Sequence, residues 1–235
     1  MAFDTYANLQ VELLSLLNRT DTDASTRAPS WITLAESQMH RRFLAAYRKG
    51  LSYPRRIMQR SDASLSDGDE FIAVPDDFAS PIDFTLTSAV PEIVLDYMEP
   101  SNFEQLKTTT QLTGQPPKYY TIKGSEFQFF PVCDQAYDAE LIYLLRFPAL
   151  SSTNTSNWIL EDYPDAYLYG AALHAAPWLK DDDRATLWGT LFQTAIDDIC
   201  AADPMPPDMA ALRTELPIIQ WLGRRGRYDI TSDSF

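Results

Sequence analysis

The spacing of apolar residues changes twice along this chain of 235 residues. Near the N-terminus and again after about residue 160, apolar side chains recur every three or four positions, which is typical of amphipathic helices. Between about residues 51 and 147, short runs of β-branched and aromatic residues alternate with turn residues, which favours β-strands. The sequence therefore predicts an α+β fold in which helices at both ends of the chain flank a β-rich middle.

Two helices are predicted before residue 50. The first is expected to have Asp4 as its N-cap and to end at Asn18. The second is expected to begin near Pro29, a residue favoured in a first helical turn, and to end at Gly50. Because each helix has one apolar stripe to bury, the two helices should pair. The stripes consist of Tyr6, Leu9, Leu13, Leu16 and Leu17, and of Ile32, Ala35, Met39, Phe43 and Ala46.

The middle of the chain contains short segments with strand character, separated by turn residues. The sequence KGS between Ile122 and Glu126 is the clearest hairpin signal. One or two helical turns, capped by Ser101, are predicted in the segment PSNFEQLK. The strand segments read FIAVP, DFTLTS, EIVLDYM, YYTI, EFQFFP and AELIYLLRF.

Two further helices are predicted after this β-rich middle. Asp162 is expected to cap the first, with Pro164 and Asp165 in its first turn, and Pro177 is expected to kink or end it. The second is expected to open at the aspartates of residues 181–183 and to stop at the DPMPP sequence of residues 203–207. The two stripes consist of Tyr167, Leu168, Ala171, Ala172 and Ala175, and of Trp188, Leu191, Phe192, Ala195, Ile196 and Ile199.

The economical arrangement of these elements is a helical bundle from the two ends of the chain, with an inserted antiparallel β-rich domain. The expected parts are N-terminal helices at residues 1–50, the β-rich insertion at 51–150, C-terminal helices at 151–203 and an extended C-terminal arm at 204–235. The alternative is a sequential α+β domain with a single core.

Composition excludes several classes of protein. The formal net charge of -14 disfavours nucleic-acid binding by the whole surface, although acidity also simply keeps a protein soluble. Cys133 and Cys200 lie far apart in the sequence, which favours a reducing compartment over a disulfide framework. No apolar run approaches the roughly 20 residues of a membrane span, and the N-terminal residues lack signal-peptide character. A soluble product of the cytosol is expected.

The usual catalytic motifs do not occur: there is no GxSxG, HExxH, GxxxxGK[ST] or GxGxxG sequence. Neither of the two histidines, His40 and His174, has a nucleophilic residue at a spacing typical of a catalytic motif. Structural roles are therefore favoured for both. The acidic clusters at residues 76–77 and 181–183 have ordinary explanations in turns and helix caps. No catalytic, cofactor-binding or metal-binding residue is therefore predicted.

Aromatic residues recur in the predicted strands and leave two interpretations open. They could form a sugar-stacking platform, or they could fill a core, as alternating aromatics in strands more often do. The residues are Tyr119, Tyr120, Phe127, Phe129, Phe130, Tyr137 and Tyr143.

Basic residues are concentrated in two places. The segment from Arg41 to Arg60 contains many of them and no acidic residue. Near the C-terminus, a basic cluster follows an apolar one on a proline-bounded tail, which is typical either of a docking arm that folds on binding or of a solvated tail. This tail contains Ile218, Ile219, Trp221, Leu222, Arg224, Arg225, Arg227 and Tyr228.

The order of several segments resembles the head-to-tail adaptor (connector) proteins of tailed bacteriophages, particularly short-tailed ones. The resemblance covers about residues 3–202. It rests on the segments LLSLLNRTD, WITLAESQMHRRF, VPDDF, GQPPKYYTIKGSEFQFFP, AELIYLLRFPALSS and SNWILEDYPDAYLYGAALHAAPWLKDDDRATLW.

The resemblance implies a structural virion protein, made in the host cytoplasm, rather than an enzyme. Such adaptors form a ring, usually of twelve copies, under the portal protein, and they join the capsid to the tail or nozzle. Genomic DNA would pass through the channel without specific binding, and no membrane or cofactor is implied. By position, the C-terminal arm would bind the portal through the eight tail residues named above.

Neighbouring copies in such a ring make a heterologous contact, in which one face complements a different face. Arg41, Arg42, Trp178 and Trp188 are candidates for this contact, although the two tryptophans fit a core position equally well. The alternative function is that of a carbohydrate-binding or hydrolytic tail-associated protein that uses the β-rich region.

Overall fold

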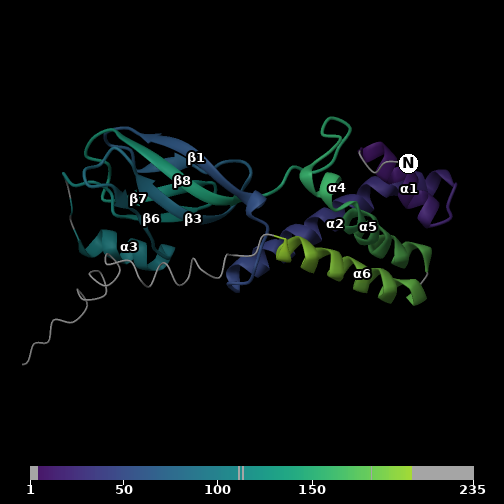
Figure 1. The fold of residues 1–235 in the computed structure, drawn as a ribbon. Helices are drawn as coiled ribbons and strands as arrows, with labels where there is room; N and C mark the ends of the chain where they lie inside the picture. The colour runs from purple at the N-terminus through teal and green to yellow at the C-terminus, as the bar shows by residue number, and fades with distance from the viewer. Residues whose placement is uncertain (1–4, 111, 113, 181, 203–235) are drawn as a thin grey trace, which may run out of the picture.

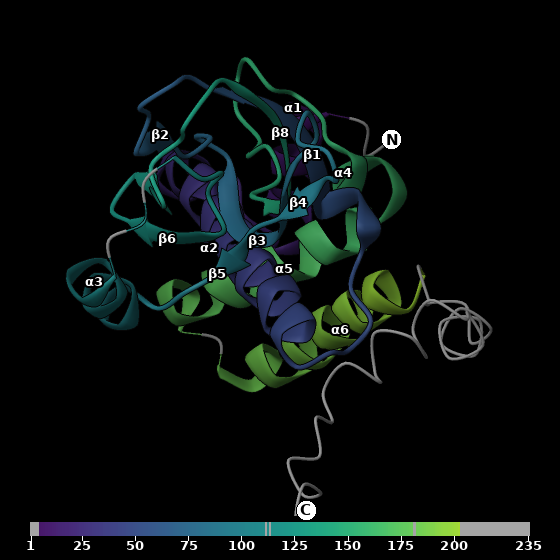
Figure 2. The same cartoon turned by 90° about the vertical axis from the view of Figure 1, so that its left-hand side faces the viewer.

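The structure is a computed structural model that describes residues 5–110, 112, 114–180 and 182–202. Of the described helices, five form a bundle at one end of the molecule, and α3 (Pro100–Thr109) lies with the strands at the other end (Figure 1). Seen from the end with the strands, the sheets lie in front and most of the bundle behind them (Figure 2). The bundle contains α1 (Tyr6–Leu16), α2 (Thr22–Arg48), α4 (Trp158–Asp162), α5 (Pro164–Leu179) and α6 (Asp182–Ala201).

This arrangement confirms the predicted α+β fold with N- and C-terminal helices around a β-rich region. The buried side chains fall into two clusters, one among the helices and one between the sheets, and only Leu145 of the partly buried residues described packs against both. The single-core alternative does not describe this arrangement. The residue boundaries of the four predicted parts stay a prediction.

Two four-stranded sheets pack against each other at the β-rich end. Their strand orders are β1-β8-β3-β4 and β2-β7-β6-β5, and the described pairs are antiparallel except β5 with β6. The strands are β1 (Met58–Leu65), β2 (Phe71–Ala73), β3 (Phe78–Leu86), β4 (Ile93–Val94), β5 (Asp96–Tyr97), β6 (Tyr119–Lys123), β7 (Glu126–Phe130) and β8 (Tyr137–Leu145).

Phe84 of β3 is central to the contact between the two sheets. Its ring lies 5.4–5.6 Å, centroid to centroid, from three rings of the facing strands β6 and β7. These edge-to-face contacts involve Tyr120, Phe127 and Phe129, and all four side chains are buried. The helix α3 (Pro100–Thr109) adds Phe103, whose ring contacts Phe130 at 6.2 Å.

The hairpin predicted at KGS is confirmed. Lys123 pairs with Glu126, and Gly124 has a φ of 64°, a left-handed conformation that suits glycine in a two-residue turn. The predicted ends of the N-terminal helices are confirmed too: Asn18 has a φ of 51°, and Gly50 follows directly after the end of α2 and its cap. Both positions carry the left-handed backbone that commonly stops a helix.

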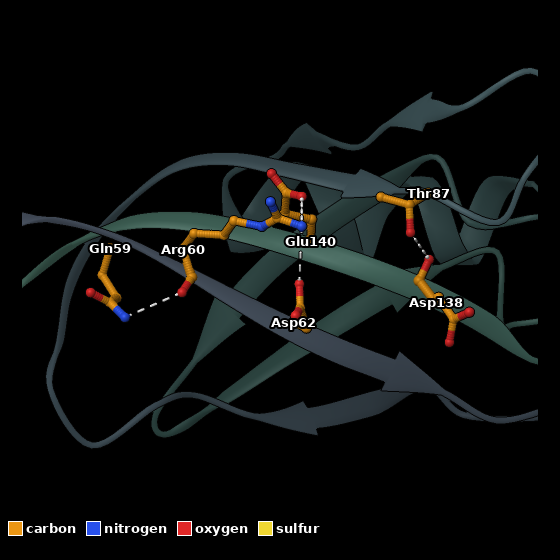
Figure 3. A network of polar contacts seen from close by, with 6 residues as sticks. All are labelled: Gln59, Arg60, Asp62, Thr87, Asp138 and Glu140. Carbon is orange, nitrogen blue, oxygen red and sulfur yellow. Dashed lines mark hydrogen bonds and ion pairs between the residues drawn. The ribbon is translucent and has the colours of Figure 1, made fainter.

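Strand β1 was not among the predicted strands. Most of its side chains are polar and exposed, because β1 is an edge strand that pairs only with β8. Asp62 lies directly opposite Glu140, and Arg60 binds both carboxylates, at 3.4 and 2.8 Å (Figure 3). Charged side chains on an edge strand protect it from pairing with other chains, which explains why its sequence lacks apolar alternation.

Several predicted helix starts were wrong. The second helix, α2, begins at Thr22, since the Asp21 carboxylate accepts the Ala24 amide at 3.1 Å, and Pro29 therefore lies inside the helix. Thr5, not Asp4, is the N-cap of α1.

The two caps predicted further along the chain were also wrong. Glu99 and not Ser101 precedes α3, while Asp162 ends α4 and Tyr163 precedes α5. Pro164 and Asp165 do lie in the first turn of α5, and the helix ends two residues after Pro177.

Candidate interaction surfaces

Trp188 and Trp178 have different environments. Trp188 is 5% exposed and belongs to the helical core, so its side chain offers little surface to a neighbour in the isolated chain. Trp178 is only partly buried, near the C-terminal end of α5, and its ring packs against that of Trp31 at 5.6 Å. Trp178 is therefore the tryptophan of this pair that reaches the surface.

Two arginines cover the Trp178 ring. The guanidinium carbons of Arg19 and Arg27 lie 5.6 and 5.8 Å from its centroid, which are cation–π distances. Arg19 precedes α2 and Arg27 lies within it. Because α2 and α5 run side by side, both arginines lie near the C-terminal end of α5. No local pattern in the sequence predicts this cluster, because its members come from three separate segments.

The basic segment between Arg41 and Arg60 divides into paired and unpaired residues. Arg56 binds Asp162 at 2.5 Å and Arg60 binds Glu140, so these charges are neutralised within the chain. Within the described part of the chain, four exposed basic residues on the C-terminal half of α2 and at its C-cap have no ion-pair partner. These are Arg41, Arg42, Arg48 and Lys49.

A groove of about 320 Å³ lies between α2 and α6, beside part of this basic surface. Arg42 and Lys49 line it on the α2 side, and Ile196 and Asp197 line it on the α6 side. The arrangement offers cations next to apolar surface, a combination that suits contact with another protein. Arg41 and Arg42 are thus exposed where a partner can reach them, while their predicted role at a contact between copies stays a prediction.

A buried polar network links α2 to α5, and the sequence reasoning missed it. Glu36 is 6% exposed, and its carboxylate accepts the Leu150 amide at 2.7 Å and the Tyr167 hydroxyl at 3.1 Å. Burial raises the pKa of Glu36, although the hydrogen bond from Leu150 opposes this shift. The available signal was an acidic residue within the apolar stripe, between Ile32, Ala35 and Met39.

The aromatic residues of the strands fill a core. Tyr120, Phe127, Phe129, Phe130, Tyr137 and Tyr143 are buried, and Tyr119 is partly buried. Burial raises the pKa values of Tyr120 and Tyr143 to about 12. The core interpretation is therefore confirmed, and these side chains do not form an exposed platform for sugar rings.

Among the residues that the structure describes, the titratable side chains do not assemble into a recognisable catalytic group. His40 and His174 belong to different helices, and burial lowers the pKa of each, with further lowering by Arg146 and Arg41 respectively. Cys133 and Cys200 are free thiols whose pKa values burial raises to about 11, which disfavours a reactive thiolate.

Over the described ranges, no group of three or more histidine, cysteine, aspartate or glutamate side chains could hold a metal ion. None of the helices described is long and apolar enough to cross a bilayer. The eight predicted portal-binding residues, from Ile218 to Tyr228, lie outside the described residues.

A comparison with protein families identifies the chain over most of its length. The family model described as SU10 adaptor protein matches residues 4–214. The match spans all the helices and strands described above. Among curated proteins, none matches the chain.

Proposed function

The chain belongs to the SU10 adaptor protein family, and on this premise we propose that it joins the portal of a tailed bacteriophage to its tail. It would form a ring of about twelve copies, in which each copy contacts its neighbours through two different faces. The observation that carries the proposal is the family match over residues 4–214, which includes both the helical and the β-rich regions. As a virion component it would be made in the host cytoplasm.

Portal binding is assigned to the C-terminal arm, residues 204–235. Its apolar residues Ile218, Ile219, Trp221 and Leu222 would supply buried anchors, and the arginines that follow would supply charge. Contacts between copies are assigned to the exposed basic surface of α2, with Arg41 and Arg42, and to the partly buried Trp178. The net charge of -14 suits a channel through which DNA passes without binding.

The decisive experiment mixes the purified chain with the portal protein of the same phage and measures the mass of the complex. A complex of the portal ring with multiple adaptor copies is expected. If no complex forms under any ionic condition, the proposed function is wrong.

Deletion of residues 204–235 tests the arm separately. The thermal unfolding midpoint should be nearly unchanged, because the described residues of both buried cores lie before residue 203, whereas portal binding should be lost. Reversal of Arg224, Arg225 and Arg227 to glutamate should weaken binding most at low salt. A matched control reverses Lys118, Lys180 and Arg184, three exposed basic residues outside the basic surface of α2, and should bind the portal normally. Normal portal binding by the deletion variant would contradict the role of the arm.

A further inference from the structure

A pocket of about 310 Å³ opens between α2 and the segment that follows β8. Residues at helical spacing on α2 form one wall, and the segment after Leu145 forms the other, so the pocket lies where the bundle meets the β-rich end. We call it the α2 pocket. It is lined by Thr33, Glu36, Ser37, His40, Arg41, Arg146, Phe147 and Ala149.

Three basic side chains of the α2 pocket have unused hydrogen-bonding capacity. His40 is only 9% exposed, yet within the described chain neither of its ring nitrogens has a hydrogen-bond partner. Buried polar atoms are usually paired, so this histidine indicates a missing partner. Arg41 and Arg146 are exposed at the same pocket, and no ion pair neutralises either guanidinium in the part of the chain that the structure describes.

The one acidic residue of the pocket does not supply that missing partner. The Glu36 carboxylate already accepts hydrogen bonds from the Leu150 amide and the Tyr167 hydroxyl, and it is not bonded to His40 or to either arginine. Glu36 therefore serves the interior of the bundle. The two exposed arginines remain available to a group that enters from solvent, and the unpartnered nitrogens of His40 lie buried beside them in the wall of the same pocket.

We propose that the α2 pocket receives an aspartate or glutamate side chain from a neighbouring copy of this chain. Arginine binds carboxylates with paired, charge-assisted hydrogen bonds, and the His40 ring adds a third group that can donate. Each copy has 33 acidic and 19 basic residues, so a neighbour presents an excess of carboxylates. The inference rests on the proposed function, since a ring places a different face of the next copy against this pocket.

The test compares ring assembly on the portal by the unchanged chain, by R41E/R146E and by K118E/K180E. The two variants change the net charge equally, and all four substituted residues are exposed, so neither variant should impair folding, which thermal unfolding checks. R41E/R146E should lower the number of bound copies at a given concentration by roughly tenfold or more, and K118E/K180E should not. Equal assembly by the two variants would overturn the inference.

A photoreactive amino acid at Ser37, which is exposed at the pocket, identifies the occupant in assembled particles. We expect crosslinks between adaptor copies that map to peptides with an aspartate or glutamate. Crosslinks only to the portal or to DNA, or no crosslinks, would overturn the assignment to a neighbouring copy. If the unchanged chain does not bind the portal at all, the proposed function fails, whereas equal binding by all three proteins removes only the role of the pocket.

Discussion

The hydroxyl of Tyr167 donates a hydrogen bond of 3.1 Å to the carboxylate of Glu36 and so joins α5 to α2 inside the bundle. The network continues through Asn157, whose amide donates to the Tyr167 oxygen at 2.7 Å and to the Pro148 carbonyl at 3.0 Å. Asn157 also caps α4 by accepting the Leu160 amide. The segment that follows β8 is thereby bonded to α2 through Leu150 and Glu36. It is also linked to α5, because Asn157 bonds both Pro148 and Tyr167.

Replacement of Glu36 by alanine should lower the free energy of unfolding by about 2 kcal/mol or more, because it leaves the Leu150 amide and the Tyr167 hydroxyl buried without an acceptor. Glu36→Gln is the matched control, since it keeps an acceptor and removes a buried charge. Its free energy of unfolding at neutral pH should lie within about 1 kcal/mol of the unchanged chain. Urea unfolding measures both, and equal losses for the two variants would contradict this role of the acceptor.

The two histidines should make the fold less stable in mild acid. The pKa values of His40 and His174 are lowered in the folded chain, so the unfolded chain binds more protons as the pH falls below about 6.5. Their stabilising contribution is complete above that pH and is lost as the pH falls toward the folded pKa values. Glu36 has the opposite sign, because a raised carboxyl pKa favours the folded state as the pH falls.

Titration of the imidazole resonances by nuclear magnetic resonance checks this prediction directly. Both histidines should titrate below about 6.5 in the folded chain and near that value in urea. His40→Phe should flatten the dependence of unfolding free energy on pH in the same window. A His40 pKa at or above 6.5 in the folded chain would contradict the prediction.

The ion pairs on the exposed face of the first sheet should contribute little. Arg60→Ala leaves Asp62 opposite the partly buried Glu140, but Arg60 and Asp62 are exposed to solvent, so the free energy of unfolding should fall by less than about 1 kcal/mol. Thermal unfolding at low and high salt measures the effect, which should shrink as salt rises. The variant R60A/D62N removes the like-charge pair and should recover the loss, whereas a large salt-independent loss would show that Arg60 has another role.

The apolar pattern predicted the fold well because periodicity reports which side of an element is buried. Ile32, Ala35, Met39 and Phe43 are fully buried, as the stripe predicted. Strand β1 and the start of α2 were missed for the same reason: edge strands and first helical turns are exposed, so few apolar residues mark them. Pro29 was a misleading signal, since proline favours a first turn but here lies within α2.

The candidate interaction residues were less predictable than the fold. Arg41 and Arg42 could be found because charge is visible in a sequence, and both are exposed. Arg146 and His40 meet at one pocket only because β8 leads the chain back to α2, a tertiary contact that no local pattern encodes. Composition left Trp178 and Trp188 indistinguishable, since their exposure depends on the position of each helix in the bundle.

Gly170 and Gly189 form a matched pair for testing the packing of the bundle. A Cβ atom at Gly170 would lie 2.7 Å from the Phe192 ring and 2.9 Å from the Ala35 Cβ, so alanine there must push α5 away from α6 and α2. The nearest atom to a Cβ at Gly189 is a Leu173 methyl at 3.8 Å, an ordinary contact. Gly170→Ala should therefore lower the free energy of unfolding by about 1–3 kcal/mol despite the better helix propensity of alanine.

Gly189→Ala should raise the free energy of unfolding by about 0.5–1 kcal/mol, because it gains helix propensity without a clash. Urea unfolding of the two variants beside the unchanged chain gives the sign of each effect. Opposite signs are expected, since the substitutions share their chemistry and differ only in the space around the glycine. A stabilising Gly170→Ala would mean that α5 lies farther from α6 and α2 than these distances indicate, and the close crossing of the three helices would then be wrong.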